Sequence, residues 1–203
     1  DKTHMKKILK LVIKVCDDGS LFIFDCGGNS KEIRDWITEK GFNFLTLMAK
    51  HTKQYKKYTS IFERSAKTSI TINDIRYQCV KINEDGVFRY IFFSNNLENL
   101  QLEKKQRKFE KAIEKGQKIE EKVKKGKELE QILCPGGWIF TKGVLQKTVE
   151  EISNPFISGI EGFFILESSV DADPEIILQL YKDRGLAENF IRDLKEGAEM
   201  RPI

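Results

Sequence analysis

The chain has 203 residues, of which 40% are hydrophobic and 33% charged, and its formal net charge is +4. This is an ordinary globular composition that can bury a core, and the small net charge permits a polyanionic partner without identifying one. The four cysteines form no CxxC pair, which argues against a zinc or redox motif. No apolar run reaches membrane-spanning length and no signal peptide opens the chain, so we expect a cytoplasmic protein without a membrane partner.

The first 52 residues combine helical and extended patterns. Residues 1–5 (DKTHM) are expected to be a tag remnant, and KKILKLVIKVC has helical spacing up to the turn DDGS. The short run LFIFD predicts a buried strand that ends at Asp25, and Ser30 caps a predicted helix that Gly41 ends. FNFLTLMAKH is a second predicted strand. The order strand, turn, helix, strand favours an α/β sheet with parallel neighbours.

The pattern changes from residue 53 to residue 160. An alternating stretch contains a predicted hairpin turn at Glu84–Asp85–Gly86. Residues 97–133 are rich in Lys and Glu and predict one long helix, or a helical hairpin broken near Gly116. We interpret this segment as a solvated helix, with a DNA clamp or a dimer contact as alternatives. The basic and aromatic run AKHTKQYKKY predicts a solvated loop or, as the alternative, a contact with a DNA backbone.

The last block predicts a strand in IEGFFILES and then a helix that Asp173 and Pro174 begin. At about 100° per residue, one polar row falls within an arc of roughly 60°. Its members are Tyr181, Arg184, Glu188 and Lys195. An apolar stripe about a quarter turn away is predicted to dock the helix on a sheet while the polar row lies along the sheet edge. That stripe consists of Ile176, Leu180, Ala187, Phe190, Ile191 and Leu194. A solvated face with i,i+4 pairs is the alternative.

The spacing Y-(2)-R-(3)-E-(6)-K, from Tyr181 to Lys195, resembles the signature of DDE transposases of bacterial and archaeal insertion sequences. The flanking stretches EGFFILESSVDADPEIILQLY and RDLKEGAEMRPI are also similar to that family, as is FIFDCGGNSKEIRDWITEKGFNFL near the start. The resemblance therefore covers nearly the whole chain. It implies an incomplete ribonuclease H-like α/β core formed by residues 6–52 and 161–203, with residues 53–160 as an inserted β-rich and helical region.

The resemblance implies metal-dependent phosphoryl transfer on DNA, with cleavage at the element ends followed by strand transfer. Two Mg²⁺ or Mn²⁺ ions about 3.5–4 Å apart suit this reaction, and such hard cations prefer carboxylate oxygens. Asp25 matches the family's second catalytic Asp and Glu188 its Glu, both as metal ligands; a plain turn-forming role is the alternative for Asp25. The side chains implied to contact DNA are Tyr181, Arg184, Arg192 and Lys195. The implied partners are double-stranded DNA, at element ends and target, and a second copy of the chain on that DNA. The protein would associate with the nucleoid when it acts.

The first catalytic Asp of the family has no counterpart in this sequence, since Asp17 and Asp18 lie in a turn only a few residues before Asp25. We therefore expect a fragment that holds two of three metal carboxylates and does not cut DNA alone. Two other functions stay open: a non-catalytic DNA-binding or assembly module derived from a transposase, and a helical protein-interaction module built on the charged segment. Carboxylates of Asp25 and Glu188 within about 8 Å of each other would favour the metal site.

Overall fold

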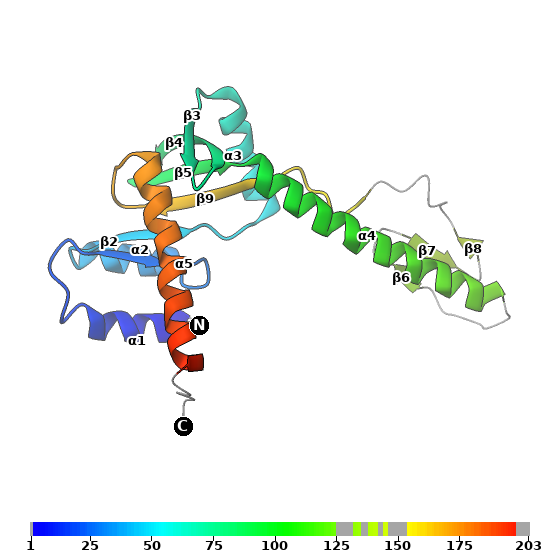
Figure 1. The fold of residues 1–203 in the computed structure, drawn as a ribbon, viewed down its shortest axis with the longest axis horizontal. Helices are drawn as coiled ribbons and strands as arrows, with labels where there is room; N and C mark the ends of the chain where they lie inside the picture. Colours follow the sequence, from blue (N-terminus) through cyan, green and yellow to red (C-terminus); the bar gives the residue numbers. More distant parts are fainter. Residues whose placement is uncertain (1, 125–131, 135–137, 142–143, 146–153, 198–203) are drawn as a thin grey trace. The chain divides into compact units, whose positions relative to one another are not determined.

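A computed structural model of the chain describes residues 2–124, 132–134, 138–141, 144–145 and 154–197. The chain forms two compact units, whose elements are labelled in Figure 1. The first unit consists of Asp1–Ser94 and Phe163–Ile203, and the second of Asn95–Gly162. Every residue predicted for the catalytic site belongs to the first unit.

A six-stranded mixed sheet organises the first unit, with strand order β1-β2-β9-β5-β4-β3. The strands are β1 (Leu21–Phe24), β2 (Asn43–Leu47), β3 (Thr68–Ile72), β4 (Ile75–Glu84), β5 (Val87–Phe93) and β9 (Phe163–Ser168). The predicted parallel pairing of β1 with β2 is confirmed, and all other neighbouring strands of this sheet are antiparallel. The fold class is therefore mixed α/β.

Local sequence signals explain the boundaries of several elements. The helix α2 (Lys31–Glu39) begins after Ser30, whose hydroxyl accepts a hydrogen bond from the Ile33 amide at 3.3 Å. The turn between β4 and β5 places Asp85 and Gly86 at φ values of 57° and 75°, the left-handed conformation that a two-residue hairpin turn requires. The predicted cap and hairpin are both confirmed.

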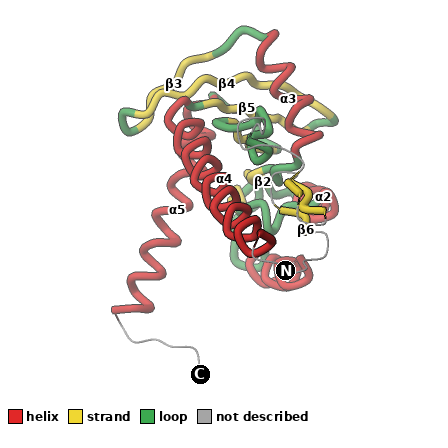
Figure 2. The backbone as a smooth tube through the Cα atoms, turned by 90° about the vertical axis from the view of Figure 1, so that its right-hand side faces the viewer, coloured by secondary structure: helices red, strands yellow, loops and turns green. Residues whose placement is uncertain are grey.

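The helices cover the two faces of the sheet (Figure 2). The helix α5 (Pro174–Gly197) lies on one face, and α2 and α3 (Thr52–Arg64) lie on the other. The helix α1 (Lys2–Val12) also belongs to the α2 side, because its Leu9 packs in the same apolar cluster as Ile33 and Ile37. The buried cluster under α5 consists of Leu45, Ile70, Ile72, Tyr77, Cys79, Tyr90, Phe92, Leu166, Ile177 and Leu178.

Residues 53–94 lie in the unit that holds the sheet, whereas the sequence placed the start of an inserted region at residue 53. The strand β5 pairs with β9 along its length, from Phe88 opposite Ser168 to Phe93 opposite Phe163. The alternating pattern of β3–β5 differs from the buried runs of β1 and β2, but both patterns occur in a mixed sheet. The predicted solvated loop in AKHTKQYKKY is wrong: residues 52–64 form α3, with Tyr55, Tyr58 and Phe62 on its buried side.

The second unit contains the charged segment and three short strands. The helix α4 (Asn95–Lys124) is continuous through Gly116, which decides between the two predicted forms in favour of one long helix. The strands β6 (Ile132–Cys134), β7 (Trp138–Thr141) and β8 (Val144–Leu145) form an antiparallel sheet. Burial would raise the pKa of the Glu161 carboxyl, but hydrogen bonds from Lys105 and Ser158 outweigh it and hold that pKa well below its usual range. The predicted turn PGGW and the end of the charged segment lie largely outside the described residues.

Candidate functional site

Asp25 directly follows β1, at the carboxyl end of two parallel strands. Side chains along a strand alternate between the faces of the sheet. Leu21 and Ile23 pack against the apolar cluster that contains Ile177 and Leu178 of α5. Alternation therefore assigns Asp25, two residues beyond Ile23, to the same side of the sheet as α5. The carboxyl ends of parallel strands are the usual place for binding sites in α/β sheets.

The carboxylate of Asp25 also organises the turn behind the strand. Its Oδ1 accepts hydrogen bonds from the amides of Gly27 at 2.9 Å and Gly28 at 3.4 Å, so the turn-forming role weighed for Asp25 is present. A Cβ at Gly27 would stand 3.1 Å from this Oδ1, tighter than ordinary contact. Asp25 is nevertheless exposed. Among the described residues both hydrogen bonds fall on Oδ1, which leaves Oδ2 for a cation.

Asn29 connects the far end of this turn to the sheet through side-chain hydrogen bonds. Its side-chain amide donates to the Leu47 carbonyl at 3.1 Å and to Glu167 Oε2 at 2.8 Å. The Arg34 guanidinium bonds to the Asn29 side-chain carbonyl and pairs with Glu167 Oε2 at 3.1 Å. Thr46 donates from its hydroxyl to the backbone carbonyl of Asp25 at 3.2 Å. The turn that presents Asp25 is therefore held from both ends.

Glu167 is the centre of a buried charged network that was not predicted. It is 2% exposed and pairs with Arg89 Nε at 3.1 Å, in addition to Arg34. Arg89 also forms a salt bridge with Glu84 at 2.7 Å, and Glu84 accepts a hydrogen bond from the Tyr58 hydroxyl at 2.7 Å. The hydrogen bond from Lys57, and next that from Tyr58, lower the pKa of the Glu84 carboxyl. Burial, and then the bond to Glu84, raise the pKa of the Tyr58 hydroxyl to about 12.

The network lies on the sheet face opposite α5. Thr46, Glu167 and Arg89 are register partners across β2, β9 and β5, so their side chains share one face. Leu45 and Leu166, the preceding residues in their strands, belong to the cluster under α5. One sequence signal was available: Glu167 is an acid inside the apolar strand FFILES, and a buried acid needs a partner.

The docking side of α5 differs from the predicted one. Ile177 and Leu178 are 1% exposed, whereas Ile176, predicted in the docking stripe, is 52% exposed. Leu180 of the predicted stripe and Tyr181 of the polar row both pack against the cluster under α5. The polar row therefore begins on the docking side of the helix rather than a quarter turn away, because Ile177 lies one turn before Tyr181.

The structure brings two residues of the polar row together. The Arg184 guanidinium lies over the Tyr181 ring, 5.1 Å from its centroid, and both residues are half-buried. Glu188, Arg192 and Lys195 belong to α5, but their side chains lie outside the description. The distance between the Asp25 and Glu188 carboxylates, which the sequence analysis set as a criterion, therefore also lies outside the description. Within the described residues, no group of three or more His, Cys, Asp or Glu side chains is arranged to hold a metal.

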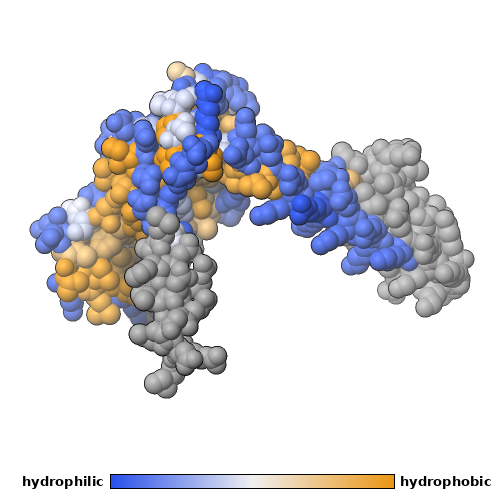
Figure 3. Space-filling model, in the orientation of Figure 1, coloured by the Kyte–Doolittle hydropathy of each residue, from blue (hydrophilic) through white to orange (hydrophobic). Residues whose placement is uncertain are grey.

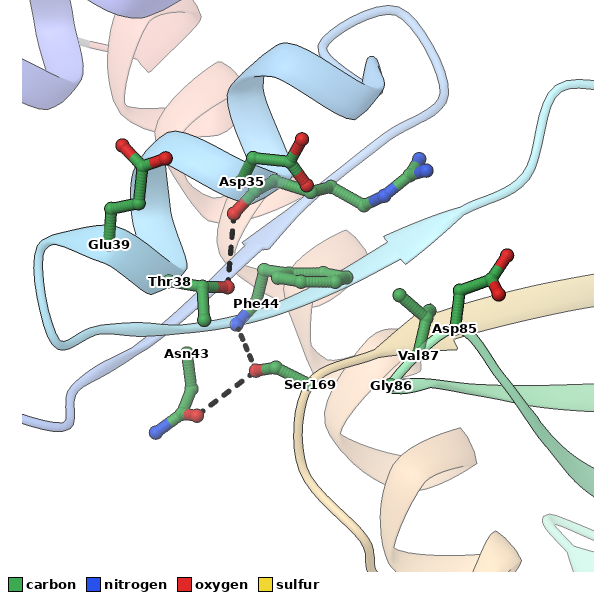
Figure 4. Close-up of a pocket in the computed structure, with 10 residues that line it drawn as sticks. Asp35, Thr38, Glu39, Asn43, Phe44, Asp85, Gly86, Val87 and Ser169 are labelled. Carbon is green, nitrogen blue, oxygen red and sulfur yellow. Dashed lines mark hydrogen bonds between the residues drawn. The ribbon is translucent and has the colours of Figure 1, made fainter.

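A pocket of about 550 Å³ opens elsewhere on the first unit (Figure 4). It is lined by Arg34, Asp35, Thr38, Glu39, Asn43, Phe44, Asp85, Gly86, Val87 and Ser169. The Ser169 hydroxyl donates to the Asn43 side chain and accepts from the Phe44 amide, both at 3.0 Å. Asn43 and Phe44 begin β2, so this pocket lies at the opposite end of the parallel strands from Asp25. It is not the candidate catalytic site.

These features define a mixed α/β protein with a carboxylate at the end of a parallel strand, on the face that a long C-terminal helix covers. Comparison with protein-family models gives a match to "Transposase DDE domain" over residues 1–199, and the chain belongs to this family. Membership implies DNA transposition and DNA binding, and DDE transposases generally use divalent metal ions. Searches among curated proteins and among solved structures returned no match. None of the described helices has the length and apolarity needed to cross a membrane.

Proposed function

We propose that this chain carries two carboxylates of a transposase metal site, Asp25 and Glu188, and acts in DNA cleavage and strand transfer. The observation that supports this most is the placement of Asp25 after β1, on the side of the sheet that α5 covers. Glu188 follows Tyr181 by seven residues, which is nearly two helical turns. The helical period therefore continues the docking side of α5 to Glu188.

Divalent cations such as Mg²⁺ or Mn²⁺, two in the complete enzyme, would supply charge stabilisation around the phosphate in this family. The chain's own contribution is to hold the ligands in place. Asp25 is fixed by its turn and by Asn29, and Glu188 stands on a helix docked through Ile177 and Leu178. A carboxylate held like that of Asp25 needs little rearrangement when a cation binds.

The remaining polar row is proposed to contact DNA near the cleaved end. Arg184, stacked on Tyr181, presents a planar cation suited to phosphate oxygens. Arg192 and Lys195 continue along the same helix toward its C-terminus. The proposal also includes the Y-(2)-R-(3)-E-(6)-K group, a ribonuclease H-like core, a homodimer on DNA and action at the nucleoid. In it the chain supplies two of three catalytic carboxylates, so cleavage of DNA by the isolated chain would contradict that part.

Metal binding tests the site directly. Mn²⁺ binding to the full chain is measured by electron paramagnetic resonance for the wild type, Asp25→Asn and Glu188→Gln. Each substitution is expected to weaken Mn²⁺ binding at least about tenfold, since even residues that only orient metal ligands contribute that much. Asp74→Asn is the matched control: Asp74 is exposed in the β3–β4 turn with a φ of 61° that Asn also adopts.

Equal Mn²⁺ binding in all four proteins would exclude Asp25 and Glu188 as ligands. If the wild type binds duplex DNA but no Mn²⁺, the non-catalytic DNA-binding module becomes the better function. If deletion of residues 101–131 abolishes a protein contact while DNA binding persists, the helical interaction module gains support.

A further inference from the structure

The solvent-facing side of α3 carries a row of cations. Lys53, Lys56, Lys57 and Arg64 are all exposed, and at about 100° per residue they fall within an arc of about 100°. From residue 50 to residue 67 the chain has six basic residues and one acidic residue, a net charge of +5 against +4 for the whole chain. The row is about 16 Å long at 1.5 Å per residue. This helix and its flanks therefore carry an excess of positive charge, as residues 2–14 also do with five basic residues and no acidic one.

This charge does not stabilise the helix. The first turn of α3 contains no acidic residue, and its N-cap, His51, makes no side-chain capping bond. Lys53 stands near the positive end of the helix dipole, where a cation is unfavourable. Like charges three or four residues apart also repel, by about 0.2–0.5 kcal/mol per pair. Of the four cations in the row, Lys57 alone forms an ion pair within the described residues, with Glu84 at 2.5 Å.

The rings beneath the row determine how it can bind. Tyr55 and Tyr58 are 1% and 2% exposed, and their hydroxyls bond to the Met48 carbonyl and to Glu84. Buried rings cannot stack on nucleic-acid bases. They support the cations instead, since Lys57 Nζ lies 5.2 Å from the centroid of the Tyr58 ring. The surface thus offers positive charge without stacking, which matches a phosphate backbone rather than exposed bases.

The row begins at the end of the sheet where β1 and β2 finish, which is also where Asp25 lies. The helix α3 starts five residues after β2 ends, and β2 is the parallel neighbour of β1. Lys50, just before α3, donates from its Nζ to the Phe163 carbonyl of β9 at 3.2 Å. Phe163 begins β9, which is antiparallel to β2, so Phe163 lies at the same end of the sheet. A duplex positioned at Asp25, on the α5 side of the sheet, would reach the start of α3 by passing the ends of β2 and β9.

We propose that the exposed face of α3 binds the phosphate backbone of duplex DNA beside the candidate catalytic site, without reading its sequence. The inference rests on the DNA partner of the proposed function and adds a second contact surface to that of α5. Charge complementarity selects a polyanion as the partner. Every exposed residue of α3 is polar or charged, so little apolar area is offered there to a membrane or to the core of another protein. Figure 3 shows the opposite, α5 side of the first unit, where apolar patches are visible.

The test measures binding of the full chain to a short fluorescent DNA duplex of arbitrary sequence by anisotropy, over a NaCl titration. The triple variant Lys53→Gln, Lys56→Gln, Arg64→Gln is compared with Lys104→Gln, Lys111→Gln, Lys115→Gln. The second set is the matched control, because these three lysines are exposed on α4 and their loss changes the net charge equally. Circular dichroism checks that both variants keep the wild-type helix content.

The α3 variant is expected to bind the duplex at least about tenfold more weakly at low salt. The slope of log K against log salt is expected to fall by up to about 2.7, since each neutralised phosphate contributes about 0.9. The α4 variant should keep a slope close to that of the wild type. Lys53→Arg with Lys56→Arg should bind like the wild type, because charge rather than side-chain shape is required.

Equal loss in the two triple variants would reduce the effect to net charge and overturn the inference, while the metal site and the DNA partner of the proposed function would stand. Tighter binding of single-stranded DNA of the same length would overturn it too, because that preference requires accessible rings. A wild-type chain that does not bind the duplex at all would remove both the α3 surface and the DNA partner, but would leave the Mn²⁺ result as a separate measurement.

Discussion

The two faces of the sheet are stabilised in different ways, although they share the same six strands. Under α5 the contacts are apolar and include fully buried rings and aliphatic side chains, such as Tyr90, Phe92 and Leu166. On the α2 and α3 side, the apolar cluster under α2 is accompanied by a hydrogen-bonded charged network in the strands, which includes Glu167 and Arg89. An apolar face stabilises without direction, whereas a charged network fixes specific atoms. Here the fixed atoms include the end of the turn that presents Asp25.

The strongest test of this difference is removal of the acid at the centre of the network. Glu167→Ala leaves the guanidinium groups of Arg34 and Arg89 without their shared carboxylate. Loss of one partner of a buried ion pair typically costs about 3–5 kcal/mol. The free energy of unfolding is measured by urea denaturation with Trp36 fluorescence, in a Trp138→Phe background. Glu39→Ala, at an exposed site on α2, is the control. A loss below about 1 kcal/mol for Glu167→Ala would show that the network adds no stability.

On the apolar face, two residues within one turn of α5 provide a matched pair. Leu178 is 1% exposed and Ile176 is 52% exposed. Leu178→Ala is expected to lower the free energy of unfolding by about 2–5 kcal/mol, and Ile176→Ala to change it by at most about 0.5 kcal/mol. The same urea titration measures both. Equal losses, or a larger loss for Ile176→Ala, would return the docking side of α5 to the stripe predicted from sequence.

A smaller effect of opposite sign is expected within α5. Gly185 lies in the helix interior, and a Cβ there would meet nothing within 4 Å. Gly185→Ala should therefore raise the free energy of unfolding by about 0.5–1 kcal/mol, because Ala loses less backbone entropy in a helix. Gly86→Ala, in the β4–β5 turn with a φ of 75°, should instead destabilise the protein. Destabilisation by Gly185→Ala would indicate that space at this position is required.

The charged face also predicts a pH dependence in the alkaline range. The folded protein retains the Tyr58 proton up to a pKa of about 12, against an ordinary value of 10.0. The unfolded chain binds fewer protons between these values, so this contribution to stability is complete below about pH 10 and is lost as the pH rises toward about 12. Tyr58→Phe should flatten part of the loss in urea titrations between about pH 10 and about pH 12. Burial also raises the pKa values of Tyr55, Cys79 and Tyr90, which contribute to the loss as well. If the Tyr58→Phe variant lost as much stability at alkaline pH as the wild type, Tyr58 would be excluded as a source of that loss.

The sequence predictions that the structure confirms were based on local signals. The Ser30 cap, the Asp85–Gly86 turn and the Asp173–Pro174 helix start each depend on a few neighbouring residues, so short-range rules suffice for them. The network around Glu167 could not be found in this way, because its partners Arg34 and Arg89 are 133 and 78 residues away. Only tertiary pairing brings them together.

The sequence predictions for the secondary structure of α3 and for the docking side of α5 were wrong for different reasons. In α3, Tyr55, Tyr58 and Phe62 already have helical spacing, but the interpretation weighed their chemistry and the lysines before their period. In α5, grouping by hydrophobicity selected Ile176 and omitted Ile177, which is the residue that the sheet covers. The proposal for Glu188, Arg192 and Lys195 rests on Asp25, the docking of α5 and the family.

The second unit leaves the sheet after Ser94 and the chain returns at Phe163, which is a direct partner of Phe93. In polymer terms, the 68 residues from Asn95 to Gly162 close a hairpin loop between β5 and β9. Closing so long a loop costs only about 2.5 kcal/mol more than closing a four-residue turn, since the cost grows with the logarithm of length. A unit that folds by itself would bring its own ends into place before β9 pairs, and would remove part of even this penalty. The central strand pair can therefore tolerate large changes in what lies between its ends.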